Sequence, residues 1–212
     1  MEKADSPARR RRRDAGVKIG AVILAAGSSS RLGQPKQLLQ YEGRILVRRA
    51  AEAAFAAGCD PVAVVVGAER EKVAAALRDL AVLIVPNEDW AHGIGTSIRA
   101  GVARLRENDA VLLLVCDQLF LSADLLRRLI DDQQKTQKPI AASAYAGTVG
   151  VPSLFTRACF AQLLSLGEEE GAKTLLTSPP NEVAQIDFPL GAIDIDTPGD
   201  FRALQDDHGV SP

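Results

Sequence analysis

The sequence predicts one α/β domain, a Rossmann-like three-layer α/β/α sandwich in which helices cover both faces of a mostly parallel sheet. Three observations support this prediction. Short apolar runs typical of buried strands alternate with helical segments that have one apolar face. The 212 residues are enough for one such domain with a full core. A small-residue loop and a carboxylate follow two of the apolar runs, where α/β sheets bind ligands.

Composition is that of an ordinary globular protein, with 47% hydrophobic and 25% charged residues. Residues 1–16, with the run Arg9–Arg13, predict a disordered basic tail before a single domain over residues 17–212. The acidic remainder argues against nucleic-acid binding. No apolar run reaches the ~20 residues of a membrane span, so no membrane partner is expected. The three cysteines have no paired spacing, which favours a reducing cytoplasm over a disulfide scaffold or zinc site.

The first apolar run, Ile19 to Leu24, opens into the stretch LAAGSSSRLGQPKQLL, and Leu24 is the first residue of that stretch. Ala25, Ala26 and Gly27 have little or no side chain, so the backbone here can approach a ligand closely. A strand that ends in such a loop predicts a site where backbone amides meet anionic oxygens.

Two cations in the same stretch, Arg31 and Lys36, favour a nucleoside triphosphate as the ligand, because they supply charge opposite to that of the phosphates. Pro35 stiffens the approach to Lys36. The stretch is not a Walker loop, because two residues separate Gly33 from Lys36. The alternative is a Ser-rich surface turn after a core strand.

The next elements alternate as the fold class requires. They are the helix 44–57, which Gly58 ends, the strand 61–66, the helix 69–80 and the strand 81–85. The following stretch, Asn87 to Val102, contains two glycines and then Thr96 and Ser97, which have the side chains of helix caps. This stretch is either a flexible connection before a capped helix or a second loop over the base and ribose of the nucleotide. Trp90 is either a lid residue or a packing residue.

Residues 110–115 form an almost wholly apolar run that predicts a central strand, and Asp117 follows it. A carboxylate at the carboxyl end of a buried strand lies where α/β sheets bind ligands. Ser122 is the better N-cap for the next helix, so Asp117 remains available as a magnesium ligand.

The rest of the chain predicts a strand at 140–145 and short helices at 155–164 and 172–176. The stretch 192–201 predicts a strand that Thr197-Pro198 stops, with Pro198 in the first turn of the last helix. The glutamates 168–170 between the two helices are typical of a solvated turn. Asp194 and Asp196 alternate with isoleucines, so both face the same side of the last strand. Two carboxylates on one side of a strand end favour a cation or solvent beside them.

These motifs resemble the nucleotidyltransferases of the nucleotide-diphospho-sugar transferase fold, above all the molybdenum cofactor cytidylyltransferase branch of the molybdopterin nucleotidyltransferase-like family. The resemblance rests on the Ala-Ala-Gly loop, on CDQLF after the central strand, on Gly150-Val151-Pro152 and on Asp196-Thr197-Pro198. It implies one antiparallel strand in the sheet. In that branch the run after the central strand reads Asp-Gln-Pro, and this chain has Leu119 in place of the proline.

The resemblance also implies roles for the residues of the site. Lys36 would contact the α-phosphate and Arg31 the β- and γ-phosphates. Leu24, Ala25, Ala26 and Gly27 would hold the base and triphosphate, and Ser97 would contact cytosine. Asp117 and Asp196 would bind magnesium, with Asp194 a weaker candidate.

The implied reaction is transfer of CMP from CTP to the phosphate of molybdopterin, with release of pyrophosphate. The product would pass to an apo molybdenum hydroxylase. Three alternatives stay open: cytidylyl transfer to another phosphorylated acceptor such as methylerythritol phosphate, guanylyl transfer to molybdopterin, and a cofactor-insertion chaperone without catalysis. Ala26, where guanylyl-transferring relatives usually have glycine, argues against the second.

Overall fold

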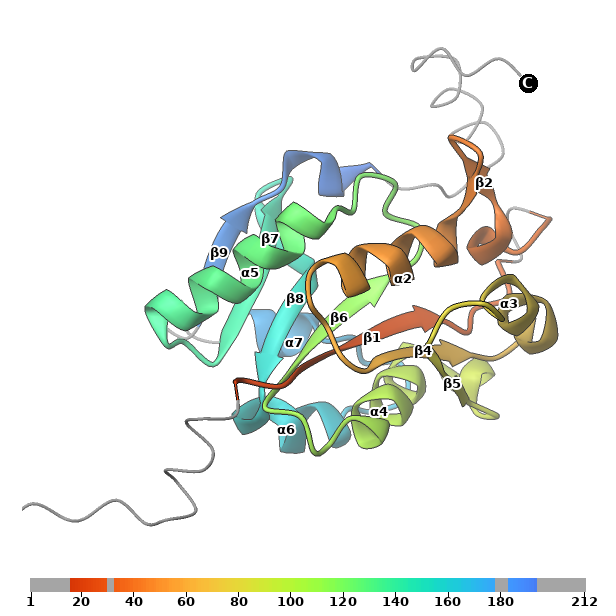
Figure 1. Cartoon of the computed structure of the whole chain (residues 1–212). Helices are drawn as coiled ribbons and strands as arrows, with labels where there is room; N and C mark the ends of the chain where they lie inside the picture. Colours follow the sequence, from red (N-terminus) through yellow and green to blue (C-terminus); the bar gives the residue numbers. More distant parts are fainter. Residues whose placement is uncertain (1–15, 30–32, 178–182, 194–212) are drawn as a thin grey trace, which may run out of the picture.

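A computed structural model describes residues 16–29, 33–177 and 183–193. Its centre is a seven-stranded sheet in the order β5-β4-β1-β6-β8-β7-β9 (Figure 1). The strands are β1 (Ile19–Ala25), β4 (Val62–Val66), β5 (Leu83–Pro86), β6 (Ala110–Val115), β7 (Ile140–Tyr145), β8 (Thr148–Thr156) and β9 (Val183–Asp187). Only β8 runs antiparallel to its neighbours in this sheet, which confirms the predicted mixed α/β class.

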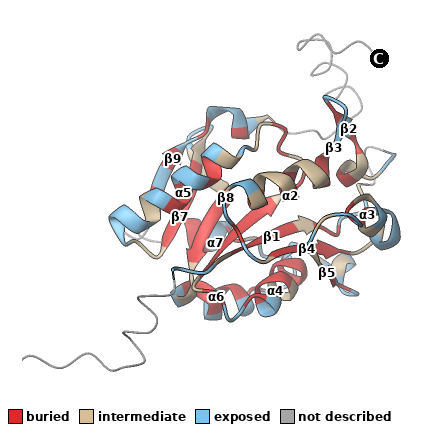
Figure 2. Cartoon of the chain, in the orientation of Figure 1, coloured by how far each residue is buried: buried red, intermediate tan, exposed pale blue. Residues whose placement is uncertain are grey.

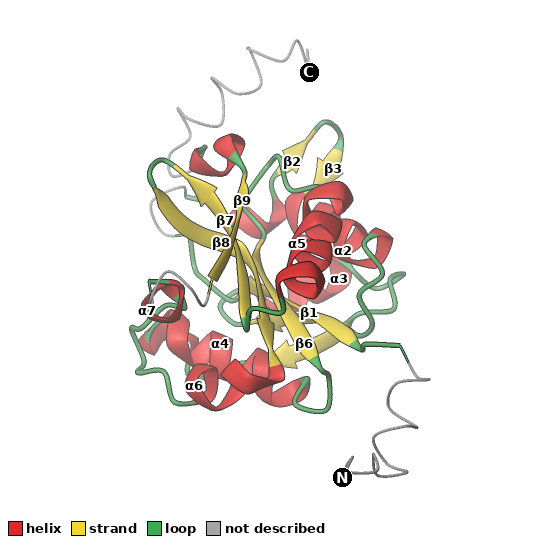
Figure 3. Ribbon diagram, turned by 90° about the vertical axis from the view of Figure 1, so that its left-hand side faces the viewer, coloured by secondary structure: helices red, strands yellow, loops and turns green. Residues whose placement is uncertain are grey.

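Helices lie on both faces of the sheet (Figure 3). One face is covered by α2 (Leu46–Ala56), α3 (Arg70–Ala76) and α5 (Ala123–Thr136). The other is covered by α4 (Ile94–Arg104), α6 (Phe160–Leu164) and α7 (Lys173–Leu176). The short elements are the hairpin β2 (Gln40–Tyr41) and β3 (Arg44–Ile45) and the 3-10 helices η1 (Lys36–Leu38), η2 (Trp90–His92), η3 (Arg157–Cys159) and η5 (Pro189–Ala192).

The strands β1, β4 and β6 have no polar side chains, which suits strands that are buried on both faces of the sheet (Figure 2). In β1 successive side chains pack against the helices on opposite faces of the sheet. Ala21 and Ile23 pack in the cluster under α2, α3 and α5, whereas Val22 packs in the cluster under α4, α6 and α7. The lack of polar residues in this run suits β1 to its interior position in the sheet, between β4 and β6.

Gly101 allows α4 to approach the sheet closely, and we expect Gly101→Val to be destabilising. A Cβ at this position would lie 2.3 Å from Val22 Cγ1 and 3.0 Å from Val65 Cγ2, both of them core atoms. Overpacking should lower the free energy of unfolding by about 1–3 kcal/mol. Urea denaturation measures this. Ala103→Val, at an exposed position of the same helix, is the matched control and should change it by less than about 0.5 kcal/mol; equal effects would contradict the packing argument.

Several element boundaries differ from the predictions. The helix expected at 44–57 begins at Leu46, because the preceding residues pair in the β2–β3 hairpin. Thr96 and Ser97 lie inside α4, whose N-cap is Gly93. Residues 148–156, partly assigned to a helix, form β8, because they pair with both β6 and β7. Strand β9 was not expected, since Val183–Asp187 is short and half polar in pattern.

Some predictions fall on residues that the structure does not describe. They concern the basic tail, of which residues 1–15 lie outside the described ranges, and most of the strand expected at 192–201. Within the described ranges, none of the helices combines the length and the apolar character needed to cross a membrane.

Candidate functional site

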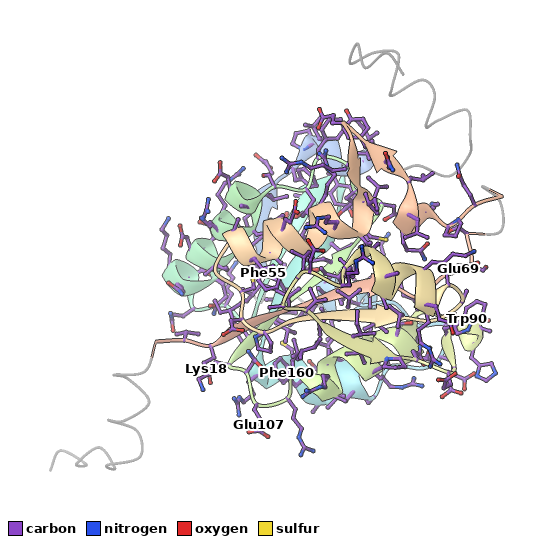
Figure 4. The ribbon with its side chains drawn as sticks, turned by 45° about the vertical axis from the view of Figure 1, so that its right-hand side comes forward. Lys18, Phe55, Glu69, Trp90, Glu107 and Phe160 are labelled. Carbon is purple, nitrogen blue, oxygen red and sulfur yellow. The ribbon has the colours of Figure 1, made fainter. Side chains whose placement is uncertain are left out.

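A pocket of about 380 Å³ opens at the carboxyl ends of β1 and β6, between the loop after β1 and the start of α4. The lining residues are Leu24, Ala26, Gly27, Ser29, Lys36, Gln37, Trp90, Gly93, Ile94, Ser97, Val115, Cys116 and Asp117. Figure 4 shows Trp90 at the end of the molecule opposite Lys18, which precedes β1. The pocket therefore lies at the edge of the sheet where α/β proteins bind ligands.

Lys36 and Asp117 meet across this pocket. Lys36 Nζ lies 3.4 Å from Asp117 Oδ2, with 17% of the Lys36 side chain and 26% of the Asp117 side chain exposed. Pro35, with φ −62°, precedes the short helix η1 that begins at Lys36. The Lys36 amide donates to Ser29 Oγ at 2.9 Å, which ties η1 back to the loop after β1. The Lys36 ammonium group and the Asp117 carboxylate, 81 residues apart in the sequence, thus lie side by side at the pocket.

Gln37 is a site residue that the sequence analysis missed. Its side chain is 3% exposed, and Nε2 donates to the carbonyls of Ala25 at 3.1 Å and Gly27 at 2.7 Å. The amide therefore holds the curvature of the small-residue loop that walls the pocket. A polar residue beside a proline and a lysine gives no sign of burial in the sequence, so only the fold reveals this role.

We expect Gln37→Leu to remove the hydrogen bonds that hold the loop after β1 in place. Two carbonyls would lose their donor inside the protein, which should lower the free energy of unfolding by about 1–3 kcal/mol and weaken binding of the nucleotide that the sequence leads us to expect at this pocket. Thermal denaturation and a calorimetric CTP titration measure the two effects. Gln133→Leu is the control, because Gln133 donates to one carbonyl, that of Lys138, at the end of α5. CTP affinity equal to that of the wild type in Gln37→Leu would refute the supporting role.

The opposite wall is formed by Gly93, Ile94 and Ser97 at the start of α4. The Gly95 amide donates to the Glu168 carbonyl at 2.8 Å, and a Cβ on Gly95 would lie 1.9 Å from the Gly167 carbonyl oxygen. Gly95 is therefore needed for close backbone contact, whereas Gly93, with φ 133°, is needed both for its backbone conformation and because a Cβ would lie 2.4 Å from the Glu168 carbonyl oxygen. The turn at 168–170 has exposed side chains, as expected, but its backbone positions this wall.

Trp90 is half-buried and packs on the loop after β4. A Cβ on Gly67 would lie 2.5 Å from Trp90 Cγ, so this glycine makes room for the indole. The packing role considered for Trp90 is therefore present in the structure, and the residue also lines the pocket.

Cys116 also lines the pocket, but its thiol is not a nucleophile. Burial raises the pKa of the Cys116 thiol, and the negative charge of Asp117 raises it further. The thiol stays protonated at neutral pH and serves as a wall of the pocket.

A second, apolar chamber of about 260 Å³ adjoins the first pocket. Leu24, Ile94 and Val115 line both, so the two spaces are neighbours across these side chains. The other lining residues are Ile98, Leu113, Tyr145, Thr148, Val149, Gly150, Val151, Gly171, Ala172, Lys173 and Leu176. Most of this wall is aliphatic, and β8 supplies its far side.

The donor set at Asp117 fits a hard divalent cation. Magnesium is commonly held by one or two protein carboxylates together with substrate phosphates. Asp117 offers one carboxylate at the pocket edge. In the described part of the chain no group of three or more His, Cys, Asp or Glu side chains is placed to hold a metal on its own. The arrangement therefore suits a metal that arrives with a nucleotide.

Six of the nine predicted site residues come together at this pocket: Leu24, Ala26, Gly27, Lys36, Ser97 and Asp117. The side chain of Ala25 instead packs in the core, and its carbonyl is bound by Gln37. Arg31 and Asp196, together with Asp194, lie outside the described residues.

Comparisons with known proteins give a consistent result. The sequence profile described as the MobA-like NTP transferase domain matches residues 21–183. Nicotine blue oxidoreductase of Paenarthrobacter nicotinovorans is 38% identical over 129 residues, which make up 60% of this chain and 62% of that protein. The matched stretch thus spans less than two thirds of this relative.

Solved structures match over nearly the whole chain. Rv0371c from Mycobacterium tuberculosis H37Rv superposes with a TM-score of 0.78 at 32% identity, covering 90% of this chain and 98% of that one. The same protein has also been solved in complex with manganese. A nucleotidyl transferase from Methanothermobacter thermautotroptrophicus gives a TM-score of 0.74 at 25% identity, covering 91% of this chain and 98% of that one.

Proposed function

Because the chain belongs to the MobA-like NTP transferase family, we propose that it transfers CMP from CTP to the phosphate of molybdopterin and releases pyrophosphate. The observation that carries this proposal is the pairing of Lys36 with Asp117 at a pocket walled by the small-residue loop. Nucleotidyl transfer needs alignment and charge neutralisation more than covalent help from the protein, and a lysine beside a carboxylate at this pocket supports such chemistry.

The chain's own residues have distinct parts in the proposed reaction. Lys36 meets the negative charge that builds on the α-phosphate as the acceptor phosphate attacks and pyrophosphate leaves. Arg31 is proposed for the β- and γ-phosphates, and the backbone of Leu24 to Gly27 for the base and triphosphate. Asp117, with Asp196, is proposed to hold magnesium, which would neutralise charge on the phosphate oxygens.

The apolar chamber supports molybdopterin over a sugar-like acceptor. A polyhydroxylated body such as methylerythritol phosphate needs hydrogen-bond partners for each hydroxyl when it leaves water. The chamber wall offers chiefly Leu, Ile and Val side chains, and the Tyr145 hydroxyl already donates to the Val151 carbonyl at 3.2 Å. A ring system with apolar faces suits such a wall better.

The name of the Paenarthrobacter relative describes that protein as an oxidoreductase. For this chain the paired Lys36 and Asp117 favour phosphate chemistry, because a lysine and a hard oxygen ligand are the groups that a nucleoside triphosphate and its cation require. A purely non-catalytic chaperone would not need this pairing.

Pyrophosphate release tests the proposal. The purified protein, magnesium and molybdopterin are incubated with CTP or with GTP, and pyrophosphate is measured enzymatically. We expect release with CTP, little with GTP, and none without acceptor. Equal release with methylerythritol phosphate would contradict the proposed acceptor, and faster release with GTP would contradict the proposed nucleotide.

A further inference from the structure

Asn87 is a buried amide that supports the start of α4, the pocket wall opposite the small-residue loop, without lining the pocket. It directly follows β5, and its backbone N–H donates to the Val66 carbonyl at 2.9 Å, which ties it to β4. Its side chain is 7% exposed. A buried amide needs partners for all its polar atoms, so its hydrogen bonds define what it does.

The side-chain amide of Asn87 makes three such bonds. Nδ2 donates to Thr96 Oγ1 at 2.9 Å and to Ser97 Oγ at 3.0 Å, while Oδ1 accepts from the Asp89 N–H at 3.1 Å. The Asp89 N–H fixes this orientation, because a flipped amide would set two donors against each other. Asn87 therefore donates to both hydroxyls and accepts from neither.

The hydroxyl hydrogens of Thr96 and Ser97 then differ in the acceptors that they can reach. Thr96 Oγ1 lies 2.7 Å from the Gly93 carbonyl and 3.1 Å from the Asp89 carbonyl, so its hydrogen stays within the protein. The Ser97 hydroxyl donates to no acceptor among residues 16–29, 33–177 and 183–193, and Ser97 lines the pocket. Among the described residues this hydrogen therefore remains available at the pocket.

We propose that Asn87 is a positioning residue that makes Ser97 a fixed hydrogen-bond donor toward the nucleobase. This inference rests on the proposed function, because it assumes a nucleoside triphosphate in the pocket. Along its pairing edge cytosine presents two acceptors, N3 and O2, and one donor, N4–H, whereas guanine presents one acceptor, O6, and two donors, N1–H and N2–H. A hydroxyl donor whose orientation is set by the protein therefore finds more acceptors on cytosine and meets two opposed donors on guanine, which favours cytosine.

The substitution Asn87→Asp tests this orientation, because a carboxylate accepts and does not donate. The Ser97 hydroxyl would turn its hydrogen toward the carboxylate and present an oxygen to the base. We expect CTP affinity to fall on the order of tenfold and the preference for CTP over GTP to disappear. Affinity for inorganic triphosphate, which has no base, should not change. Calorimetric titration without any acceptor measures all three ligands.

Two further variants make the result decisive. Ser97→Ala removes the donor without burying a charge and should reproduce the loss of selectivity. Asn108→Asp is the matched control: Asn108 is 6% exposed, donates to the Asp60 carbonyl at 3.2 Å, and precedes β6 at the opposite end of the sheet. It should lose stability but keep the CTP-to-GTP ratio.

The outcomes separate this inference from the proposed function. Unchanged selectivity in both Asn87→Asp and Ser97→Ala would overturn it, as would a wild-type protein that binds CTP and GTP equally. Loss of selectivity in these variants, in a protein that transfers nothing to molybdopterin, would support the inference and contradict the proposed acceptor.

Discussion

Lys36→Ala should lower the turnover number on the order of 10²–10³-fold while weakening CTP binding far less. Lys36 is fixed by Pro35 and by the bond from its amide to Ser29 Oγ, so its ammonium group is preorganised beside Asp117. In the proposed reaction the charge it meets is larger in the transition state than in bound CTP. Single-turnover rates beside a calorimetric CTP titration measure the two effects separately.

Two further variants test whether the loss of rate is specific to the position and the charge of Lys36. Lys36→Arg should restore only part of the rate, because a planar guanidinium does not replace a compact point charge. Lys138→Ala is the matched control, since this lysine donates to the Val183 carbonyl at the start of β9, away from the pocket. A wild-type rate with weakened CTP binding in Lys36→Ala would make Lys36 a binding group only.

Asp117→Asn should keep the fold and lose most magnesium-dependent turnover. A neutral amide is a poor ligand for a hard cation, so the rate should fall by more than about 100-fold, the upper end of what loss of a supporting group costs at metal sites. Turnover measured over a magnesium titration, with circular dichroism for the fold, tests this.

The matched control for this substitution lies at the other end of the same strand, β6. Asp109 precedes β6 at the end opposite Asp117, where it accepts from the Lys18 amide at 3.1 Å and pairs with Arg157. Asp109→Asn should therefore leave the magnesium dependence unchanged. Turnover close to that of the wild type in Asp117→Asn at equal magnesium would exclude Asp117 as a metal ligand.

The sheet could be predicted from sequence because its strands are buried on both faces. Residues 110–115 and 140–145 are apolar or small throughout, and both strands have the predicted bounds. Strand β8 was harder, since Gly150 and Pro152 interrupt its pattern and its pairing with β6 and β7 is a tertiary property. Strand β9 alternates polar and apolar residues over a short run, which sequence alone does not distinguish from a turn.

The sequence predicted those site residues whose side chains carry a charge and follow a predicted strand. Lys36 and Asp117 combine charge with a position after a strand, and the structure places both at the pocket. Gln37 and Asn87 act through bonds to backbone and hydroxyl groups that only the folded chain brings within reach. The N-cap expected at Thr96 failed for a similar reason: Gly93, packed on the Glu168 carbonyl, begins the helix earlier.

The most direct test of nucleotidyl transfer follows labelled phosphorus atoms of CTP into the products. The protein, magnesium and molybdopterin are incubated in parallel with CTP labelled at the α-phosphorus and CTP labelled at the γ-phosphorus. Attack on the α-phosphorus predicts the α label in a cytosine dinucleotide and the γ label in pyrophosphate. An α label that stays in CTP or appears only as free CMP, with no labelled dinucleotide, would contradict the proposed reaction.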